Sequence, residues 1–174
     1  MSWTRRFWAA FAVCVLLPFG AQGCEAGAAH EHAEAVSPSP VGKVLDDTDG
    51  TGRHLREVAT KNAPEVGVEV APDAAGGWDL LLNLRRFRFS PADARPKAVP
   101  GRGLAYLFVD GRPVSRLRAP EYHLAGRLVP HGTHHVTARL YADDGTVWSV
   151  HGKPVESTAD ITASGAETDA ATTP

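Results

Sequence analysis

Residues 77–91 read GWDLLLNLRRFRFSP, and the pattern of this stretch decides which fold the sequence predicts. Its apolar side chains alternate at even positions from Trp78 to Leu84 and then move to the odd positions Phe87 and Phe89. Alternation with a period of two is typical of a β-strand with one buried face. A β-bulge changes the parity inside a strand, because one extra residue re-aims every later side chain. We therefore expect one strand with a bulge at residues 85–86.

Three arginines, Arg85, Arg86 and Arg88, lie at and just after the change of parity. On a bulged strand they point to solvent, where charged side chains discourage pairing with the edges of other sheets. A cluster of arginines that binds a ligand is the alternative. The sequence favours the solvated edge and leaves the binding cluster open.

Similar strand signals continue after this stretch, with turns between them. The alternation in residues 104–109 ends at Asp110-Gly111, a pair typical of two-residue hairpin turns, and a second Asp-Gly pair follows the alternation of 136–140. No segment in this region has the 3.6-residue period of a helix. We therefore expect an all-β fold, a small antiparallel immunoglobulin-like sandwich over residues 63–156. The side chains expected to be mostly buried are Trp78, Leu82, Phe87, Phe89, Phe108, Val136, Leu140 and Trp148.

The N-terminal segment predicts export. Residues 1–23 place two arginines before an apolar stretch of about 13 residues and then small residues, which is the order of a secretory signal peptide. A membrane-spanning helix needs about 20 apolar residues, so this stretch is too short for one. Because Arg5-Arg6 resembles the twin-arginine export signal, the general and the twin-arginine routes both stay open.

Cys24 ends the sequence AQGC, which resembles the bacterial lipobox, in which small residues precede a cysteine that is acylated. Cys14 lies in the segment that would be removed, so the exported chain would carry one cysteine and no internal disulfide. We expect lipidation of Cys24 and a location outside the cytoplasm, anchored to the cell membrane. Ordinary cleavage nearby, which would give a soluble secreted or periplasmic protein, is the alternative.

Two segments flank the expected sandwich. Residues 24–62 are rich in alanine, histidine and acids, and residues 157–174 are small and polar. Such segments bury too little apolar surface to offset the entropy that ordering the chain would cost. We therefore expect residues 24–62 to be a disordered tether and residues 157–174 to be a disordered tail.

Four segments follow one another along the expected sandwich: GWDLLLNLRRFRFSP, VPGRGLAYLFVDGRPVSRL, EYHL and GTHHVTARLYADDG. Together they resemble a group of small exported bacterial domains of unassigned function. The pattern of that group contains Gly-Trp-Asn-Leu, Gly-His-Ala-His-Leu-Tyr-Val-x-Gly and aromatic-His-Leu pieces. The resemblance implies an immunoglobulin-like or cupredoxin-like β-sandwich, similar in outline to periplasmic copper-handling domains.

This sequence departs from that group at two of its three histidines. Leu104 and Tyr106 take the positions of the Gly-His-Ala-His pair, and only the third histidine persists, as His123 in EYHL. One histidine with two apolar replacements does not make a metal site. We expect His123 to be partly buried and hydrogen-bonded near a loop, beside an apolar face formed by Leu104 and Tyr106.

Other histidines remain as candidate ligands for copper or zinc. His30 and His32 lie in the expected tether as AHEHAE, a composition that is typical of weak metal binding. His131 can meet one histidine of the 134–135 pair, whose members face opposite sides of a strand, or it can meet His151 on a partner strand. The sequence does not choose among these sets.

Motifs and charge narrow the function classes. The chain has no Gly-x-Ser-x-Gly and no His-Glu-x-x-His, so we expect no enzyme. Basic and acidic residues nearly balance over 64–156, so we expect no nucleic-acid partner. Two classes remain. One is a membrane-anchored extracytoplasmic binding module, linked to the handling of copper or another metal and with a partner protein in the envelope. The other is a structural or protein-protein interaction domain without a small ligand.

Overall fold

The computed structural model describes residues 41–164, which lie within one compact unit. The signal peptide, Cys24, His30 and His32 lie outside the described residues. Within them, no helix is long and apolar enough to cross a membrane. The described elements are β1 (Lys43–Thr48), β2 (His54–Glu57), η1 (Thr60–Asn62), β3 (Glu65–Pro72), β4 (Trp78–Arg85), β5 (Arg88–Phe89), β6 (Arg102–Val109), β7 (Arg112–Leu117), β8 (Glu121–Leu124), η2 (Gly126–Leu128), β9 (Gly132–Tyr141), β10 (Val147–Val150), β11 (Lys153–Pro154) and β12 (Glu156–Ala163).

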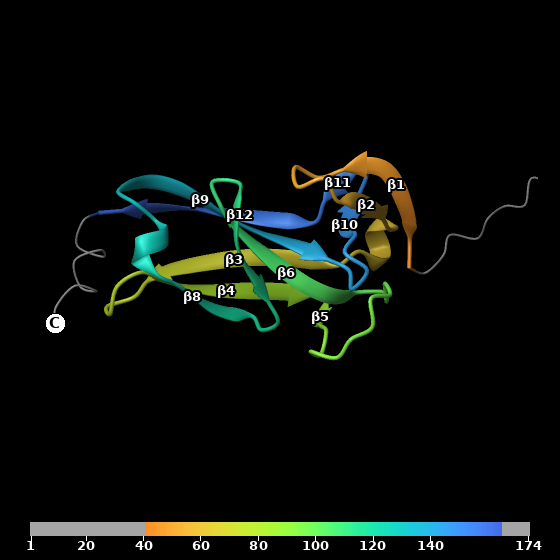
Figure 1. Ribbon diagram of the computed structural model, residues 1–174, viewed down its shortest axis with the longest axis horizontal. Coiled ribbons are helices and arrows are strands. Elements are labelled where there is room, and N and C mark those ends of the chain that lie inside the picture. The colour runs from red at the N-terminus through yellow and green to blue at the C-terminus, as the bar shows by residue number, and fades with distance from the viewer. Residues whose placement is uncertain (1–40, 165–174) are drawn as a thin grey trace, which may run out of the picture. The chain divides into compact units, whose positions relative to one another are not determined.

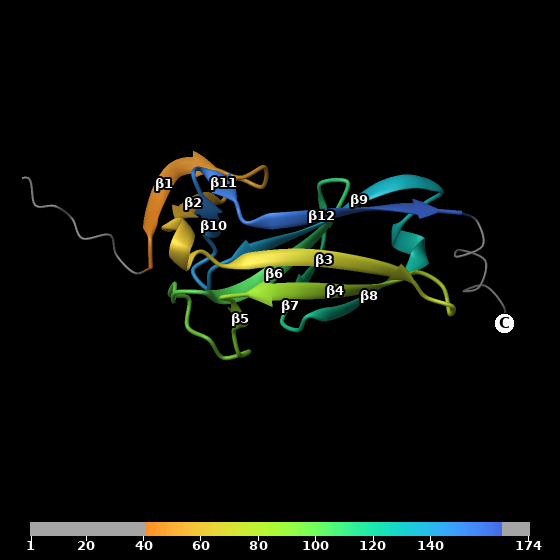
Figure 2. The same cartoon turned by 180° about the vertical axis from the view of Figure 1, so that it is seen from behind.

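These strands form two sheets (Figures 1 and 2). The larger sheet has the order β1-β2-β10-β9-β6-β5, with β11 beside β10, β12 beside β9 and β7 beside β6, and the smaller sheet has the order β3-β4-β8. The all-β prediction is therefore confirmed. The prediction of a purely antiparallel sandwich is wrong, because β2 runs parallel to β10 and β5 runs parallel to β6. Both parallel pairs involve short strands that enter the larger, curled sheet from segments that the sequence assigned elsewhere.

The core lies between the two sheets. In β4 the even-numbered Trp78, Leu80 and Leu82 are buried, and in β6 and β9 the residues that face them are also buried. Burying each such large apolar side chain stabilises the fold by roughly 1.5–3 kcal/mol. Seven of the eight side chains expected in the core are buried, and Phe89 is half-buried.

The change of parity after Leu84 has a different cause from the one expected. Strand β4 ends at Arg85, Arg86 takes a left-handed conformation with φ of 52°, and β5 then pairs with β6 in the other sheet. The prediction of a bulge is wrong because the two apolar sets belong to two sheets, which face the same core from opposite sides. Arg86 holds this crossing: its Nε donates to the Ala63 carbonyl at 2.7 Å, and its guanidinium pairs with Glu65.

Strands β1 and β2 lie in the segment expected to be a disordered tether, so that prediction does not hold for residues 43–57. The loop between them begins with Asp49, whose buried carboxylate accepts hydrogen bonds from the Tyr141 hydroxyl at 2.6 Å and from Arg139 at 2.7 Å. This contact fastens the hairpin to the outer face of the larger sheet. Composition could not indicate it, because the partners are about 90 residues away.

Strand β12 likewise occupies part of the segment expected to be a disordered tail. It pairs with β9 along eight residues, from Glu156 opposite Arg139 to Ala163 opposite Gly132. Its alternation buries Ile161 and Ala163, although small and polar residues dominate its composition. The tail prediction is therefore wrong as far as Ala163.

Candidate metal centre

Three side chains with metal-binding atoms meet on the outer face of the smaller sheet. His123 of β8 lies directly opposite Asp79 of β4, and Asp73 follows the end of β3. The Nδ1 atom of His123 is 3.1 Å from Oδ1 of Asp79 and 3.4 Å from Oδ2 of Asp73. Within residues 41–164 this is the one group of three or more such residues whose ligand atoms all lie within 4.8 Å of one another.

Strand alternation explains why two of these residues point outward. Trp78 and Leu80 are buried, so Asp79 between them faces solvent, and His123 faces solvent because Leu124 is buried. Register then pairs Asp79 with His123 across the two strands.

The turn from β3 to β4 brings in the third residue. The backbone carbonyl of Asp73 accepts a hydrogen bond from the Gly76 amide at 3.0 Å, and the Asp73 amide donates to the Gly77 carbonyl at 3.0 Å. Gly77 has φ of 97°, and a Cβ there would lie 2.4 Å from the Leu124 carbonyl oxygen. Only glycine permits this close approach, which carries Asp73 toward His123.

The geometry suits a tetrahedral ion. Zinc bonds of about 2.0–2.2 Å place neighbouring ligand atoms about 3.3 Å apart in a tetrahedron, close to the 3.1 and 3.4 Å observed here. Two carboxylates and an imidazole are ligands typical of Zn²⁺ or Mn²⁺ and not of Cu(I). An ion would replace the proton that Nδ1 now shares with Asp79. Three protein ligands would leave at least one coordination position open.

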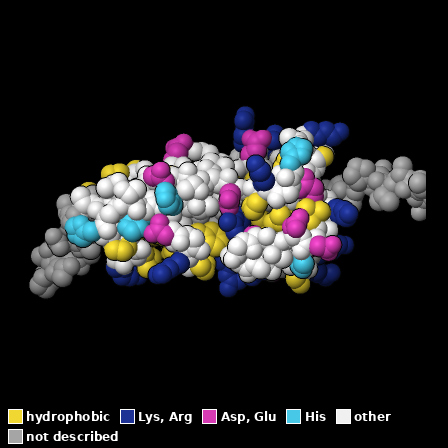
Figure 3. Space-filling view, turned by 90° about the horizontal axis from the view of Figure 1, so that it is seen from above, with side chains coloured by type: hydrophobic (Ala, Val, Ile, Leu, Met, Phe, Trp, Pro, Cys, Tyr) yellow, Lys and Arg dark blue, Asp and Glu magenta, His cyan; other side chains and the backbone are white. Residues whose placement is uncertain are grey.

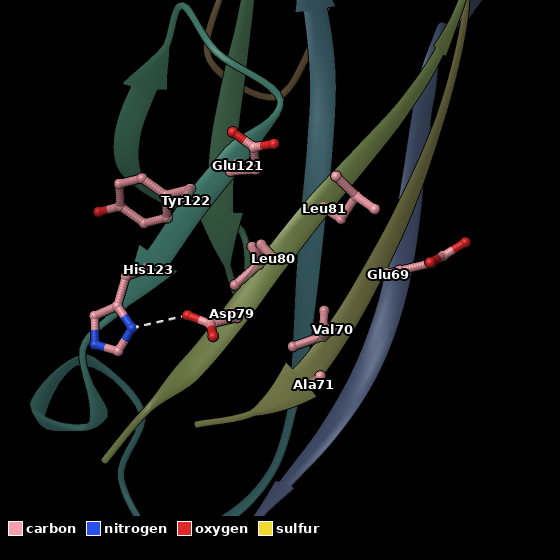
Figure 4. A pocket seen from close by; sticks show the side chains of 9 residues that line it. All are labelled: Glu69, Val70, Ala71, Asp79, Leu80, Leu81, Glu121, Tyr122 and His123. Carbon is pink, nitrogen blue, oxygen red and sulfur yellow. Dashed lines mark hydrogen bonds and ion pairs between the residues drawn. The ribbon is translucent and has the colours of Figure 1, made fainter. Parts of the chain in front are cut away.

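The centre is open to water. The side chains of His123, Asp79 and Asp73 are 47%, 66% and 27% exposed. An open hollow of about 1000 Å³ adjoins them along the sheet. Figure 4 shows the hydrogen bond between His123 and Asp79 at one end of this hollow. The residues that line it are Glu69, Val70, Ala71, Asp79, Leu80, Leu81, Glu121, Tyr122 and His123.

His123 is hydrogen-bonded beside a loop, as expected, but it is exposed and does not lie beside Leu104 and Tyr106. Ala105 and Leu107 face the core, so Leu104 and Tyr106 face away from it, and Tyr106 stacks on Tyr141 at 4.1 Å. The core thus separates these residues from His123. That part of the prediction is wrong: Tyr106 packs in a second apolar cluster with Leu45 and Leu55 of the β1–β2 hairpin.

His134, His135 and His151 have partners other than a metal-binding group. His134 and His135 face opposite sides, as expected, and pair with Asp110 and Asp160 at 2.6 Å each. His151 contacts the Thr60 hydroxyl at 3.1 Å. Neither His131 nor His151 belongs to a three-ligand group among the residues that the structure covers. Figure 3 shows histidines scattered among acidic and basic side chains over one face of the molecule.

The sequence interpretation found His123 and missed Asp73 and Asp79. A signal for Asp79 was present, since it is the one polar residue between two buried positions of the strand. Its partnership with His123 depends on register, which no local pattern indicates.

Comparisons with protein-family models, with curated proteins and with solved structures found no match for this chain. The resemblance noted from the sequence therefore stays a prediction. The structure shows a small all-β domain with two sheets.

Proposed function

We propose that this chain is an extracytoplasmic binding module, anchored to the bacterial cell membrane through Cys24, that binds a divalent metal ion at Asp73, Asp79 and His123. The observation that carries the proposal is the convergence of three ligand atoms from two strands and one turn. The export signal and lipobox-like sequence of the N-terminus support the location. The mixed oxygen and nitrogen ligands support Zn²⁺ or Mn²⁺ as the ion.

Binding fits this centre better than catalysis does. Metal-ion catalysis uses a dry, shaped cavity in which the ion activates water or a substrate. Here the Asp79 side chain is 66% exposed and the adjoining hollow is open. The exposure also limits affinity, because water competes for the ion and the ligands are held loosely. We expect a dissociation constant on the order of micromolar for Zn²⁺.

Calorimetric titration of ZnCl₂ into the chain from residue 24 tests the proposal, since that chain retains the whole compact unit. His123→Asn and Asp79→Asn should each weaken binding at least about tenfold, because losing even an outer-shell partner of a metal ligand costs about 10–100-fold in affinity. His135→Asn is the matched control, because His135 and Asp160 form a cross-strand pair of the same kind without a third carboxylate. Equal binding by all variants, or no saturable binding, would reject the site.

A second titration separates the contribution of the N-terminal histidines from that of the folded domain. A chain that begins at Val36 lacks His30 and His32 and keeps the compact unit. We expect the micromolar site to persist in it, and any tighter binding to disappear. Tight binding by this shorter chain would show that the folded domain alone forms a stronger site than the one proposed.

A protein-interaction role is the second candidate function. The observation that favours it is the exposed Leu81 between two glutamates in the hollow beside the candidate centre.

A further inference from the structure

We propose that the outer face of the β3-β4-β8 sheet docks a positively charged, extended peptide segment of a partner protein, with an aliphatic residue between two basic residues. This surface, the Glu69–Leu81–Glu121 row, goes beyond the metal centre and does not require an ion.

The row follows from strand register. Glu69 of β3 lies opposite Leu81 of β4, and Leu81 lies opposite Glu121 of β8. Leu80 and Leu82 are buried, so all three side chains of the row are on the outer face. Neighbouring strands are about 4.8 Å apart, which places the two glutamates about 10 Å apart with Leu81 between them.

Leu81 is exposed to water on the outer face of the sheet. At 41% exposure it is one of three large hydrophobic residues in the described chain that face water to this degree. A single exposed leucine is ordinary on a protein surface. This one lies in an open hollow of about 1000 Å³, where a second aliphatic side chain could cover it.

The two glutamates of this hollow lack basic partners among the described residues. Glu69, Asp79 and Glu121 line it, and no lysine or arginine does. Glu69 accepts a hydrogen bond from the Asn83 amide at 2.7 Å, and the structure shows no ion pair for Glu69 or Glu121 in residues 41–164.

Several other acids of the described residues do have cationic partners. Asp143 pairs with Arg102 at 3.0 Å, and Glu156 pairs with Arg139 at 2.6 Å. On the small sheet itself, Glu65 pairs with Arg86, beyond the hollow. Glu69 and Glu121 thus place negative charge without an ion pair beside Leu81, where it would attract a cationic partner and repel nucleic acid and anionic lipid.

The dimensions fit an extended chain. Alternate residues of an extended peptide point the same way and are about 6.6–6.8 Å apart. A leucine placed over Leu81 therefore carries the residues two positions before and after it toward Glu69 and Glu121. Lysine or arginine at those positions reaches the carboxylates easily, because their side chains are long and flexible.

The test is a titration of the ¹⁵N-labelled chain from residue 24 with the peptide acetyl-Lys-Ser-Leu-Ser-Lys-amide, followed by amide chemical shifts. We expect saturable changes centred on residues 69, 81 and 121. Acetyl-Glu-Ser-Leu-Ser-Glu-amide should bind at least tenfold more weakly. The double variant Glu69→Gln/Glu121→Gln should also weaken binding at least tenfold, whereas Asp93→Asn, an exposed carboxylate in the loop after β5, should leave it unchanged.

Several results would overturn the proposal: no saturable shifts at millimolar peptide, equal binding of the acidic peptide, or unchanged binding by the double variant. Shifts of the same residues that depend on protein concentration alone would instead identify a second copy of this chain as the occupant, and the proposal would be wrong. Failure here is separable from failure of the metal site. His123→Asn should keep peptide binding, and the double variant should keep zinc binding.

Discussion

The outer faces of the two sheets both carry histidines and acidic side chains, but they differ in whether the acidic side chains have cationic partners. On the larger sheet, Arg139 bridges Asp49 and Glu156, and His135 pairs with Asp160. On the smaller sheet, Glu69 and Glu121 have no cationic partner in the described structure, and two aspartates share one histidine. Charges that are paired within the fold are already engaged, whereas unpaired charges remain available to a ligand. The difference separates a structural face from a candidate binding face.

The largest effect should come from the core beneath both faces. Trp78→Ala removes a side chain that is 3% exposed, and we expect it to lower the free energy of unfolding by about 3–5 kcal/mol. Leu81→Ala, on the outer side of the same strand, should change it by no more than about 0.5 kcal/mol. Urea unfolding followed by tryptophan fluorescence or circular dichroism measures both. A large loss in the Leu81 variant would mean that this face is covered within the fold.

The next effect concerns the buried carboxylate of the larger sheet. Every hydrogen-bond partner of the Asp49 carboxylate is a donor: the Tyr141 hydroxyl, the Arg139 guanidinium, the Thr51 hydroxyl and amide, and the Arg53 amide. Burial raises the pKa of Asp49, but these donors outweigh it and hold that pKa well below its ordinary range. Asp49→Asn replaces one carboxylate oxygen by an NH₂ group. In either orientation of the amide this NH₂ would face donors and lose their hydrogen bonds. We expect a loss of about 3 kcal/mol, at the low end for breaking a buried pair because Arg139 keeps Glu156.

The matched change on the smaller sheet is Asp79→Asn. Asp79 is 66% exposed and pairs with His123 alone, so we expect a change in unfolding free energy below about 0.5 kcal/mol. Comparing the two variants by urea unfolding tests whether acids on the two faces differ in role. Equal losses would show that the centre on the smaller sheet is a structural ion pair and not an available ligand set.

Sequence patterns predicted the parts of the fold that depend on local alternation. The buried face of β4 followed from the period of two. The β6–β7 turn followed from Asp110-Gly111, whose φ values of 49° and 76° are those of a two-residue hairpin turn. The exit of the chain from the small sheet at Arg86 could not be predicted, because a bulge and a change of sheet produce the same parity. Strands β1 and β2 were missed because their hairpin is held by β10 and by the Asp49 contacts to β9, about 90 residues away, and β12 was missed because its pairing with β9 has no signature in composition.

The candidate site divides in the same way. His123 was noticed through a resemblance, and the outward direction of Asp79 was readable from its neighbours. Their meeting requires the register of β4 with β8. Asp73 joins them through the turn at Gly76 and Gly77, whose geometry depends on how closely it approaches Leu124. Such convergence of residues far apart in sequence has no one-dimensional signature.

The smallest expected change in the free energy of unfolding, and the one that depends most on pH, concerns His134 in β9 of the larger sheet. Its Nδ1 lies 2.6 Å from the Asp110 carboxylate and its Nε2 lies 2.9 Å from the Pro130 carbonyl. Both partners are acceptors, so only the protonated ring donates to both. The hydrogen bond to Asp110 raises the pKa of His134, although desolvation opposes it, and the bond from His134 lowers the pKa of Asp110.

The sign of the pH dependence follows from these two shifts. A raised histidine pKa stabilises the fold fully below the ordinary value of about 6.5, and the contribution is lost as pH rises through the folded pKa. A lowered aspartate pKa stabilises the fold above about 3.9, and that contribution is lost as pH falls through the folded pKa. The pair therefore contributes most between about pH 4 and 6.5. Asp110→Asn should be less stable than the unchanged chain at pH 5.5, and the gap should narrow at pH 8.5, as measured by urea unfolding. A gap that stayed constant or widened toward pH 8.5 would show that His134 is neutral in the folded protein, and Asp93→Asn should show no gap at either pH.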